Sequence, residues 1–334
     1  MVKLGDVINV HYGKALKADQ RVSNGSVHVF GSSGIVGNHD KTLCSYPTII
    51  IGRKGSVGAI TWAPDGGWII DTAYYVEIKD NNKLDLRYLF YILSGIDLTK
   101  KTITTSIPGL NRDDLYDTFI KLPPFEEQKR IVDLLDKAEG IRQKREQAIK
   151  LADDFLRATF ATMYGNPITN PKKWPVHLMG EIIEFKGGNQ PPKSDFIFEP
   201  KQGYIRLVQI RDFKSDKYAT YIPQEKAKRI FEVDDVMIAR YGPPVFQILR
   251  GLSGSYNVAL MKASPKENIR KGFIFYLLQL PEYHDVVVKN SERTAGQTGV
   301  NLELLNKFNV PLPPIYYQDE ILARLARIEK FKEK

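Results

Sequence analysis

Short apolar runs of the kind typical of β-strands dominate two stretches of the chain. β-Branched and aromatic residues cluster in these runs, and Gly, Pro or Asp bounds them. The runs lie at residues 48–51, 68–70 and 74–78, and again at 204–210 and 236–239. Short helical stretches follow near residues 86–94 and 272–280. This pattern predicts two mixed α/β domains, each with a twisted sheet and short helices.

A different pattern begins after Pro124. From Phe125 to about Met163 there is no proline, and only Gly140 interrupts a run of good helix formers. Apolar residues recur every seven positions, as expected for a helix that packs along one stripe. The two rows of this stripe are Leu134, Ile141, Ala148 and Phe155, and Leu135, Ile149, Leu156 and Met163. The pattern predicts one helix of roughly 58 Å; the alternative is an amphipathic helix packed in an ordinary core.

The chain repeats itself. Leu122-Pro123-Pro124, followed by Gln128, recurs as Leu312-Pro313-Pro314, followed by Gln318, at an offset of 190 residues. Residues 89–93 match 274–278 at an offset of 185, and residues 4–8 match 179–183 at 175. A slowly drifting offset is what small loop insertions between shared elements produce. We therefore divide the chain into a first α/β domain (1–121), a helix (122–164), a second α/β domain (165–310) and a second helix (311–334).

The positive charge lies mainly outside the long helix. The formal net charge is +9. Residues 165–310 carry 21 basic and 15 acidic side chains, residues 1–121 carry 14 and 12, and residues 122–164 carry eight of each. An excess of Lys and Arg on the two domains favours a polyanionic partner, because neutralised phosphates release counterions. The single cysteine, Cys44, and the lack of a signal-peptide pattern favour a cytoplasmic protein.

Few stretches of the chain suggest catalysis. There is no Walker-type phosphate loop, and the five histidines have no metal-ligand spacing. One permissive match is Pro64-Asp65, followed after 11 residues by Glu77-Ile78-Lys79, in which the carboxylates of Asp65 and Glu77 would hold Mg²⁺ for a nuclease. The alternative is a turn at Asp65 and a strand that exposes Glu77 and Lys79. The sequence therefore predicts no catalytic residue and no metal site.

Residues suited to base or phosphate contact occur in three places. Bidentate readout of bases uses Arg or Lys for guanine and Asn or Gln for adenine. The first group is Tyr204, Arg206, Gln209, Arg211 and Lys214. The second group is a basic loop after a strand, with Arg53 and Lys54 in the first domain and Arg240 and Tyr241 in the second. The third group is a polar loop before each helix, with Ser106 and Asn111 in the first domain and Gln297, Thr298 and Asn301 in the second. Solvated charge, a tight turn and a helix cap are the alternatives for these groups.

Together these motifs resemble the specificity subunits of type I restriction-modification systems. The most specific stretches are residues 121–132 (KLPPFEEQKRIV) and residues 294–301 (TAGQTGVN), the latter leading into Val310-Pro311-Leu312-Pro313-Pro314. The resemblance covers almost the whole chain. It implies that each α/β domain is a target recognition domain for one part of a bipartite DNA site. It also implies that the two long helices form an antiparallel coiled-coil spacer.

The same resemblance implies which partners supply the chemistry. Modification subunits would bring S-adenosylmethionine-dependent adenine methylation, and restriction subunits would bring ATP-driven translocation and Mg²⁺-dependent cleavage. This chain would then need no cofactor of its own. Leu134, Ile141, Phe155 and Leu156 would serve helix packing or a subunit interface.

One feature departs from the family pattern. The second helix, starting near Ile315, reaches Lys334 after 20 residues and cannot pair along the whole of the first. A shortened specificity subunit completed by a second copy of the chain is the hypothesis that follows. A magnesium-dependent nuclease and a coiled-coil scaffold without affinity for DNA are the competing readings of the whole sequence.

Overall fold

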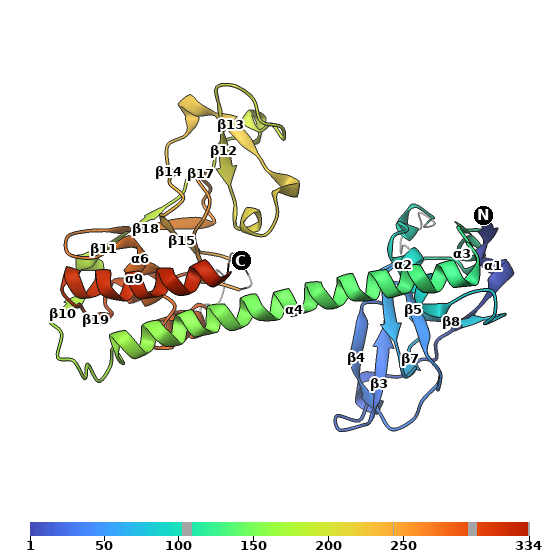
Figure 1. The fold of residues 1–334 in the computed structure, drawn as a ribbon. Coiled ribbons are helices and arrows are strands. Elements are labelled where there is room, and N and C mark those ends of the chain that lie inside the picture. The colour runs from blue at the N-terminus through green and yellow to red at the C-terminus, as the bar shows by residue number, and fades with distance from the viewer. Residues whose placement is uncertain (102–108, 243, 293–298, 333–334) are drawn as a thin grey trace. The chain divides into compact units, whose positions relative to one another are not determined.

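The chain divides into two compact units, Met1–Lys144 and Arg145–Lys334 (Figure 1). The computed structural model describes residues 1–101, 109–242, 244–292 and 299–332. Three of the candidate DNA-contacting residues, Ser106, Gln297 and Thr298, lie outside these ranges. Within them, no helix combines the length and the apolarity needed to cross a bilayer.

Unit 1 contains a sheet of four antiparallel strands in the order β2-β8-β5-β6 and a smaller sheet in the order β4-β3-β7. Its strands are β1 (Val2–Lys3), β2 (Ile8–Tyr12), β3 (Val27–Gly31), β4 (Gly34–His39), β5 (Thr48–Gly52), β6 (Ile60–Ala63), β7 (Trp68–Ile69), β8 (Ala73–Ile78) and β9 (Phe119–Ile120). Its helices are α1 (Leu4–Val7), α2 (Leu86–Ser94), α3 (Arg112–Tyr116) and the first half of α4 (Phe125–Tyr164), with 3-10 turns η1 (Ala18–Gln20) and η2 (Leu98–Lys101).

Unit 2 contains the second half of α4 and repeats the plan of unit 1. Its strands are β10 (Val176–Leu178), β11 (Ile183–Gly187), β12 (Tyr204–Val208), β13 (Tyr221–Pro223), β14 (Ile230–Phe231), β15 (Val236–Ala239), β16 (Ile248–Leu249), β17 (Gly254–Tyr256), β18 (Leu260–Pro265) and β19 (Asn309–Pro311). Its other helices are α5 (Met179–Ile182), α6 (Lys271–Leu277), α7 (Pro281–Glu292), α8 (Leu302–Asn306) and α9 (Ile315–Lys332). Its 3-10 turns are η3 (Lys193–Asp195), η4 (Ile210–Phe213), η5 (Asp216–Tyr218) and η6 (Gln224–Lys226).

The strand order confirms the internal repeat. The main sheet of unit 2 runs β11-β18-β15-β16, again antiparallel throughout. In both units a short strand pair joins the start of the domain to its end, β1 with β9 and β10 with β19. A parallel pair also recurs in the smaller sheets, β3 with β7 and β12 with β17. The chain is therefore a tandem of two mixed α/β domains, as the sequence predicts.

The long helix is continuous from Phe125 to Tyr164, close to the predicted bounds. Its 40 residues correspond to about 60 Å of helix. Pro123 and Pro124 precede its first turn, where missing backbone N–H groups are tolerated. At its end, Gly165 adopts φ +92°, the left-handed conformation that commonly terminates a helix.

A buried glutamine fixes the start of this helix to unit 1. The Gln128 side chain is fully buried. Its Nε2 donates to the carbonyls of Lys83 (2.8 Å) and Pro123 (2.9 Å), and its Oε1 accepts from the backbone N of Asp85 (2.9 Å). The amide thereby satisfies three backbone groups around the start of α2 and of α4, which would otherwise be buried without partners.

Unit 2 repeats this arrangement at the start of α9. Gln318 is also fully buried, and its Nε2 donates to the carbonyls of Asn268 (2.8 Å) and Pro313 (2.9 Å). Its Oε1 accepts from the backbone N of Arg270 (2.9 Å). An uncharged amide suits both positions because it combines two donors with an acceptor.

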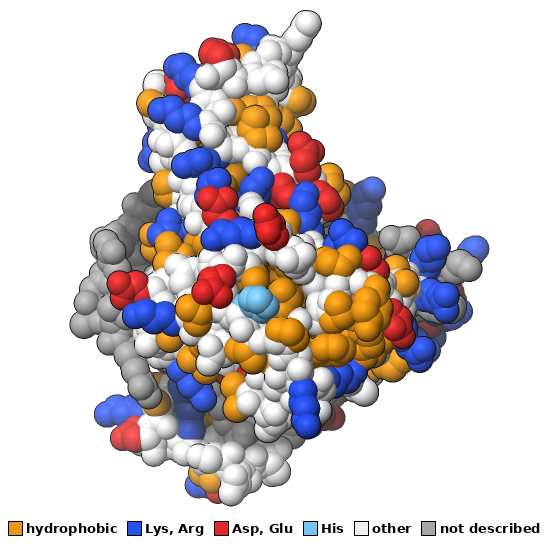
Figure 2. Space-filling model, turned by 90° about the vertical axis from the view of Figure 1, so that its left-hand side faces the viewer, with side chains coloured by type: hydrophobic (Ala, Val, Ile, Leu, Met, Phe, Trp, Pro, Cys, Tyr) orange, Lys and Arg blue, Asp and Glu red, His pale blue; other side chains and the backbone are white. Residues whose placement is uncertain are grey.

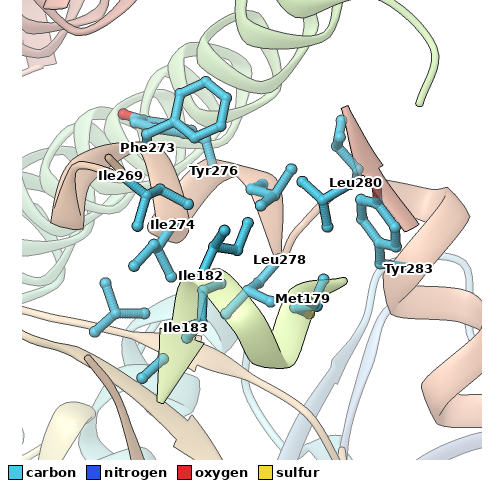
Figure 3. Close-up of a cluster of buried hydrophobic side chains, with 14 of the residues drawn as sticks. Met179, Ile182, Ile183, Ile269, Phe273, Ile274, Tyr276, Leu278, Leu280 and Tyr283 are labelled. Atoms are coloured by element: carbon cyan, nitrogen blue, oxygen red, sulfur yellow. The ribbon is translucent and has the colours of Figure 1, made fainter. Parts of the chain in front are cut away.

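The core of unit 2 gathers α5, α6 and the second half of α4 over the main sheet. Figure 3 shows Met179 and Ile182 of α5 converging with Phe273 and Ile274 of α6. Phe160 of α4 stacks against this group, with its ring centroid 5.2 Å from that of Phe273. The end of α4 is thus an integral part of the second domain.

Helix α9 runs back along the end of α4 in the antiparallel direction (Figure 1). The hydroxyl of Tyr317, near the start of α9, donates to the carbonyl of Met163 at the end of α4 (3.0 Å). Two buried apolar residues of α9, Ile321 and Leu325, join the shared core of unit 2 rather than a seam with α4 alone. The antiparallel direction agrees with the expectation, and a coiled-coil seam remains a prediction.

The predicted packing stripe of α4 is largely exposed. Leu134, Ile141 and Phe155 are 70 %, 69 % and 59 % exposed, whereas Leu156 is 4 % exposed. The helix uses other faces to pack: residues 128, 131 and 132 in unit 1, and residues 156, 160 and 164 in unit 2. For Leu134, Ile141 and Phe155, a role in helix packing or at a subunit interface stays a prediction, since each domain core takes other faces of α4.

The helix predicted at residues 272–280 ends earlier in the structure than the sequence pattern suggests. Helix α6 ends at Leu277, and a separate helix, α7, begins at Pro281. Proline is favoured in the first turn of a helix because its missing N–H costs nothing there. The proline is the signal that could have revealed α7.

Replacing Gln128 with Leu should destabilise unit 1 by about 2–4 kcal/mol, because the variant leaves a buried N–H and two buried carbonyls without partners. The measurement is urea unfolding of the full-length chain followed by circular dichroism. Gln143→Leu is the matched control, since Gln143 lies exposed on the same helix and bonds only the side chain of Glu139 (2.8 Å). Equal stability of the two variants would contradict the role assigned to Gln128.

Candidate nucleic-acid interface

The small sheet β13-β12-β17-β14 of unit 2 carries the most basic surface segment. Residues 201–229 contain eight Lys and Arg side chains and three Asp and Glu side chains. Figure 2 shows Lys and Arg side chains on the upper part of one face, over this sheet, with acidic side chains gathered near its base. A basic, partly aromatic surface on a small sheet suits the backbone of a nucleic acid.

Arg206, a candidate base reader on β12, is held by two carboxylates. Its Nη2 lies 2.7 Å from Asp216 Oδ1 and 4.0 Å from Asp212 Oδ1. Asp212 is buried, and this burial raises the pKa of its carboxyl above the ordinary value. Asp212 Oδ2 also accepts from the backbone N of Gln209 (2.7 Å). The positive charge of Arg206 is therefore paired with carboxylates of the same unit. Gln209 is the N-cap residue of the turn η4 that follows.

Arg211 and Lys214, by contrast, are exposed. The Arg211 guanidinium lies 5.6 Å from the ring centroid of Tyr218, which is itself 56 % exposed. Lys217 lies over the same ring at 5.3 Å. Tyr204 is half-buried, with Lys201 Nζ 5.3 Å from its ring. These exposed residues form a basic rim, which offers cations and an aromatic face to a ligand in solvent.

Arg53 and Arg240 occupy equivalent backbone positions in the two units. Each follows the central strand of its main sheet, β5 or β15. The carbonyl of Arg53 accepts from Leu110 N (2.9 Å), and that of Arg240 accepts from Val300 N (3.1 Å). The next residues form matching isolated bridges, Lys54 with Gly109 and Tyr241 with Gly299. The basic loops that the sequence shows after a strand in each domain therefore lie at structurally equivalent positions.

The polar loops before α3 and α8 provide helix caps. The Asn111 side chain accepts from the backbone N of Asp113 (3.2 Å), and the Asn301 side chain accepts from Leu304 N (3.1 Å). Side-chain capping satisfies N–H groups that the first helical turn leaves free. These two asparagines thus cap α3 and α8, and their contact with DNA stays a prediction.

The nuclease-like residues are not assembled into a site. Glu77 Oε2 pairs with His11 Nε2 (2.9 Å), and Lys79 donates to the backbone carbonyl of Gly5. Asp65 is exposed in the turn between β6 and β7. Across the described ranges, no group of three or more His, Cys, Asp and Glu side chains could hold a metal ion. The turn-and-strand alternative accounts for these residues.

Sequence reasoning missed two residues beside Arg53. Tyr12 lies close to its guanidinium, and Arg112 lies close to the same Tyr12 ring, although they are about 40 and 60 residues away in the chain. No local pattern marks them, because only the sheet topology brings β2, β5 and α3 together.

Comparison with known proteins places this architecture in a family. The model of the type I restriction modification DNA specificity domain matches residues 1–151 and 171–334, one match for each half of the repeat. The chain belongs to this family. The duplicated family match coincides with the duplicated sheets.

Individual relatives are distant. The specificity subunit of the type I restriction enzyme EcoBI from Escherichia coli is 22% identical over 323 residues, covering 85% of this chain and 67% of that protein. The MjaVIII specificity subunit from Methanocaldococcus jannaschii is 20% identical over 296 residues, covering 77% of this chain and 67% of that protein. Among solved structures, the S subunit of a type I restriction-modification system from M. genitalium has a TM-score of 0.58 at 16% identity, covering 99% of this chain and 93% of that one. This last likeness supports the fold.

Replacing Asp216 with Asn should raise the affinity for duplex DNA several-fold at low salt. The substitution removes a negative charge from the basic rim and releases one partner of Arg206. Fluorescence anisotropy with a labelled duplex measures the change. Glu225→Gln makes the same charge change at an exposed residue of the same segment and should have a smaller effect. A D216N variant that binds no better than E225Q would show that Arg206 does not face DNA.

A second prediction concerns the nuclease alternative. The double variant D65A/E77A should leave DNA cleavage by the assembled restriction enzyme unchanged, because neither carboxylate lies in a metal site of the described residues. A plasmid-cleavage assay with matched amounts of wild-type and variant chain tests this. Loss of cleavage with normal DNA binding would restore the nuclease reading.

Proposed function

We propose that this chain is the DNA specificity subunit of a type I restriction-modification enzyme. The single observation that carries the proposal is the tandem repeat of one α/β domain, with the same strand order in both copies and a family match to each. Two homologous domains in one chain suit a DNA site made of two separate parts. Each domain would read one part.

The candidate contact residues fall into two roles under this proposal. Arg211 and Lys214 are exposed cations that suit phosphate or guanine contact, whereas Arg206 becomes available only if its carboxylate partners give way. Arg53 and Lys54 would contact DNA from unit 1, and Arg240 and Tyr241 from the equivalent place in unit 2. The remaining candidates in this group are Tyr204, which begins β12, and Gln209, which is the N-cap residue of η4.

The exposed stripe on α4 supports a role in assembly. Leu134, Ile141 and Phe155 are large apolar side chains in solvent, a feature that marks interaction surfaces. We assign this stripe to the docking of modification subunits, with a second copy of the chain as the alternative partner. Restriction subunits would join the resulting complex.

Under this proposal the chain is non-catalytic and acts in the cytoplasm. S-adenosylmethionine, ATP and Mg²⁺ would bind to the partner subunits, and this chain would hold no cofactor. Its contribution is to place the methyltransferase or nuclease on a particular DNA sequence.

Methylome sequencing of cells with and without the gene tests the proposal directly. We expect one adenine motif, split by unspecified bases, to lose its methylation when the gene is deleted and to regain it on complementation. Complementation with the D65A/E77A variant is the matched control and should restore the motif fully. An unchanged methylome in cells that express the modification subunits would refute the assignment.

A further inference from the structure

Two arginines in unit 1 share one tyrosine ring. Tyr12 is the last residue of β2 and pairs across the sheet with Tyr74 of β8. The Cζ atom of Arg53 lies 5.0 Å from the centroid of the Tyr12 ring, and that of Arg112 lies 5.3 Å from it. Arg53 also lies 5.8 Å from the Tyr74 ring. Tyr12 is 45 % exposed, so this cluster is at the surface.

The backbone holds both arginines in place. The carbonyl of Arg53 accepts from Leu110 N (2.9 Å), and its Nη1 donates to the carbonyl of Asp71 (3.2 Å). Arg112 is the first residue of α3, directly after the capping residue Asn111. The Arg53 guanidinium is therefore positioned before any ligand arrives, and the start of α3 places Arg112 beside the Tyr12 ring, which lowers the entropy cost of binding.

The two positive charges are not compensated within the described chain. Neither Arg53 nor Arg112 forms an ion pair with a described carboxylate, and Arg112 Nε is buried without a hydrogen-bond partner. Contact with an aromatic face stabilises each cation by about 0.5–1 kcal/mol at an exposed site, but it does not neutralise the positive charge. An anionic ligand would neutralise it.

We propose that Arg53 and Arg112, aligned by Tyr12, each contact a backbone phosphate of duplex DNA in unit 1. The inference rests on the proposed function and adds Arg112 and Tyr12 to its contact residues. A guanidinium offers parallel N–H donors that match two phosphate oxygens, and these contacts fix register rather than read sequence. The cluster would thus anchor the first domain on its half of the site.

Unit 2 has different residues at the positions equivalent to Tyr12 and Arg112. Gly187 ends β11 as Tyr12 ends β2, and the guanidinium of Arg240 passes close to it: a Cβ atom there would lie 3.0 Å from Arg240 Nη1. Leu302 begins α8 as Arg112 begins α3. The two-arginine cluster is consequently a property of unit 1 alone among these equivalent positions.

The test is the salt dependence of binding by the full-length chain to a labelled duplex of arbitrary sequence. Loss of one phosphate contact should reduce the slope of log Kobs against log salt by about 0.9. We expect this reduction for Arg112→Gln, together with a several-fold loss of affinity on every duplex. Arg112→Lys, which keeps the charge, should recover most of the slope, and Tyr12→Leu should weaken binding by misplacing both guanidinium groups.

Lys83→Gln is the matched control, because Lys83 is an exposed cation of the same unit that pairs with Asp80 (3.4 Å). Its slope should equal that of the wild type. If R112Q binds with the wild-type slope while the wild type shows salt-sensitive binding, the phosphate site is wrong and the proposed function stands. If the wild type itself shows no salt-sensitive binding, both fail together. Circular dichroism of R112Q and R112K identifies any variant that has lost its fold.

Discussion

The structure depends on one buried side-chain amide, used twice. Gln128 and Gln318 each enter the interior at the first turn of a helix and satisfy three backbone groups there. An unpaired buried amide or carbonyl is costly, so the helix can begin only where these partners converge. This geometry ties the direction of each helix to the sheet of its own domain. The Pro-Pro pair before each glutamine has the complementary effect, because it stops the helix from starting earlier.

Much of this fold could be predicted from the sequence, because its regular elements follow local rules. The run from Phe125 to Tyr164 lacks proline, and its helix has nearly the predicted bounds. The strands β5 and β15 match the predicted runs for a similar reason: both are buried along their full length. The face on which α4 packs could not be predicted. A seven-residue stripe shows which residues could pack together, but the shapes of two separate cores decide which residues do.

The candidate site likewise contains residues that a local pattern reveals and residues that only the topology brings together. Arg53 and Arg240 were found because an arginine after a strand is repeated in both domains. Arg112 was missed because its relation to Arg53 exists only after the sheet has formed. Arg206 has the composition of a base reader, yet it lies against Asp216, and no sequence rule connects residues on a strand and a later turn. Residue type thus indicates which contacts a side chain could make, and topology decides which of these side chains face solvent.

The placement of the buried amides has a consequence for evolution. Every partner of Gln128 lies within residues 83–123, and every partner of Gln318 lies within residues 268–313. No hydrogen bond of either anchor would be cut if a recombination event exchanged one unit, Met1–Lys144 or Arg145–Lys334, as a block. The helix start would carry its own attachment to the incoming domain. A gene built in this way can acquire a new reading surface through a single crossover, without compensating changes elsewhere in the chain.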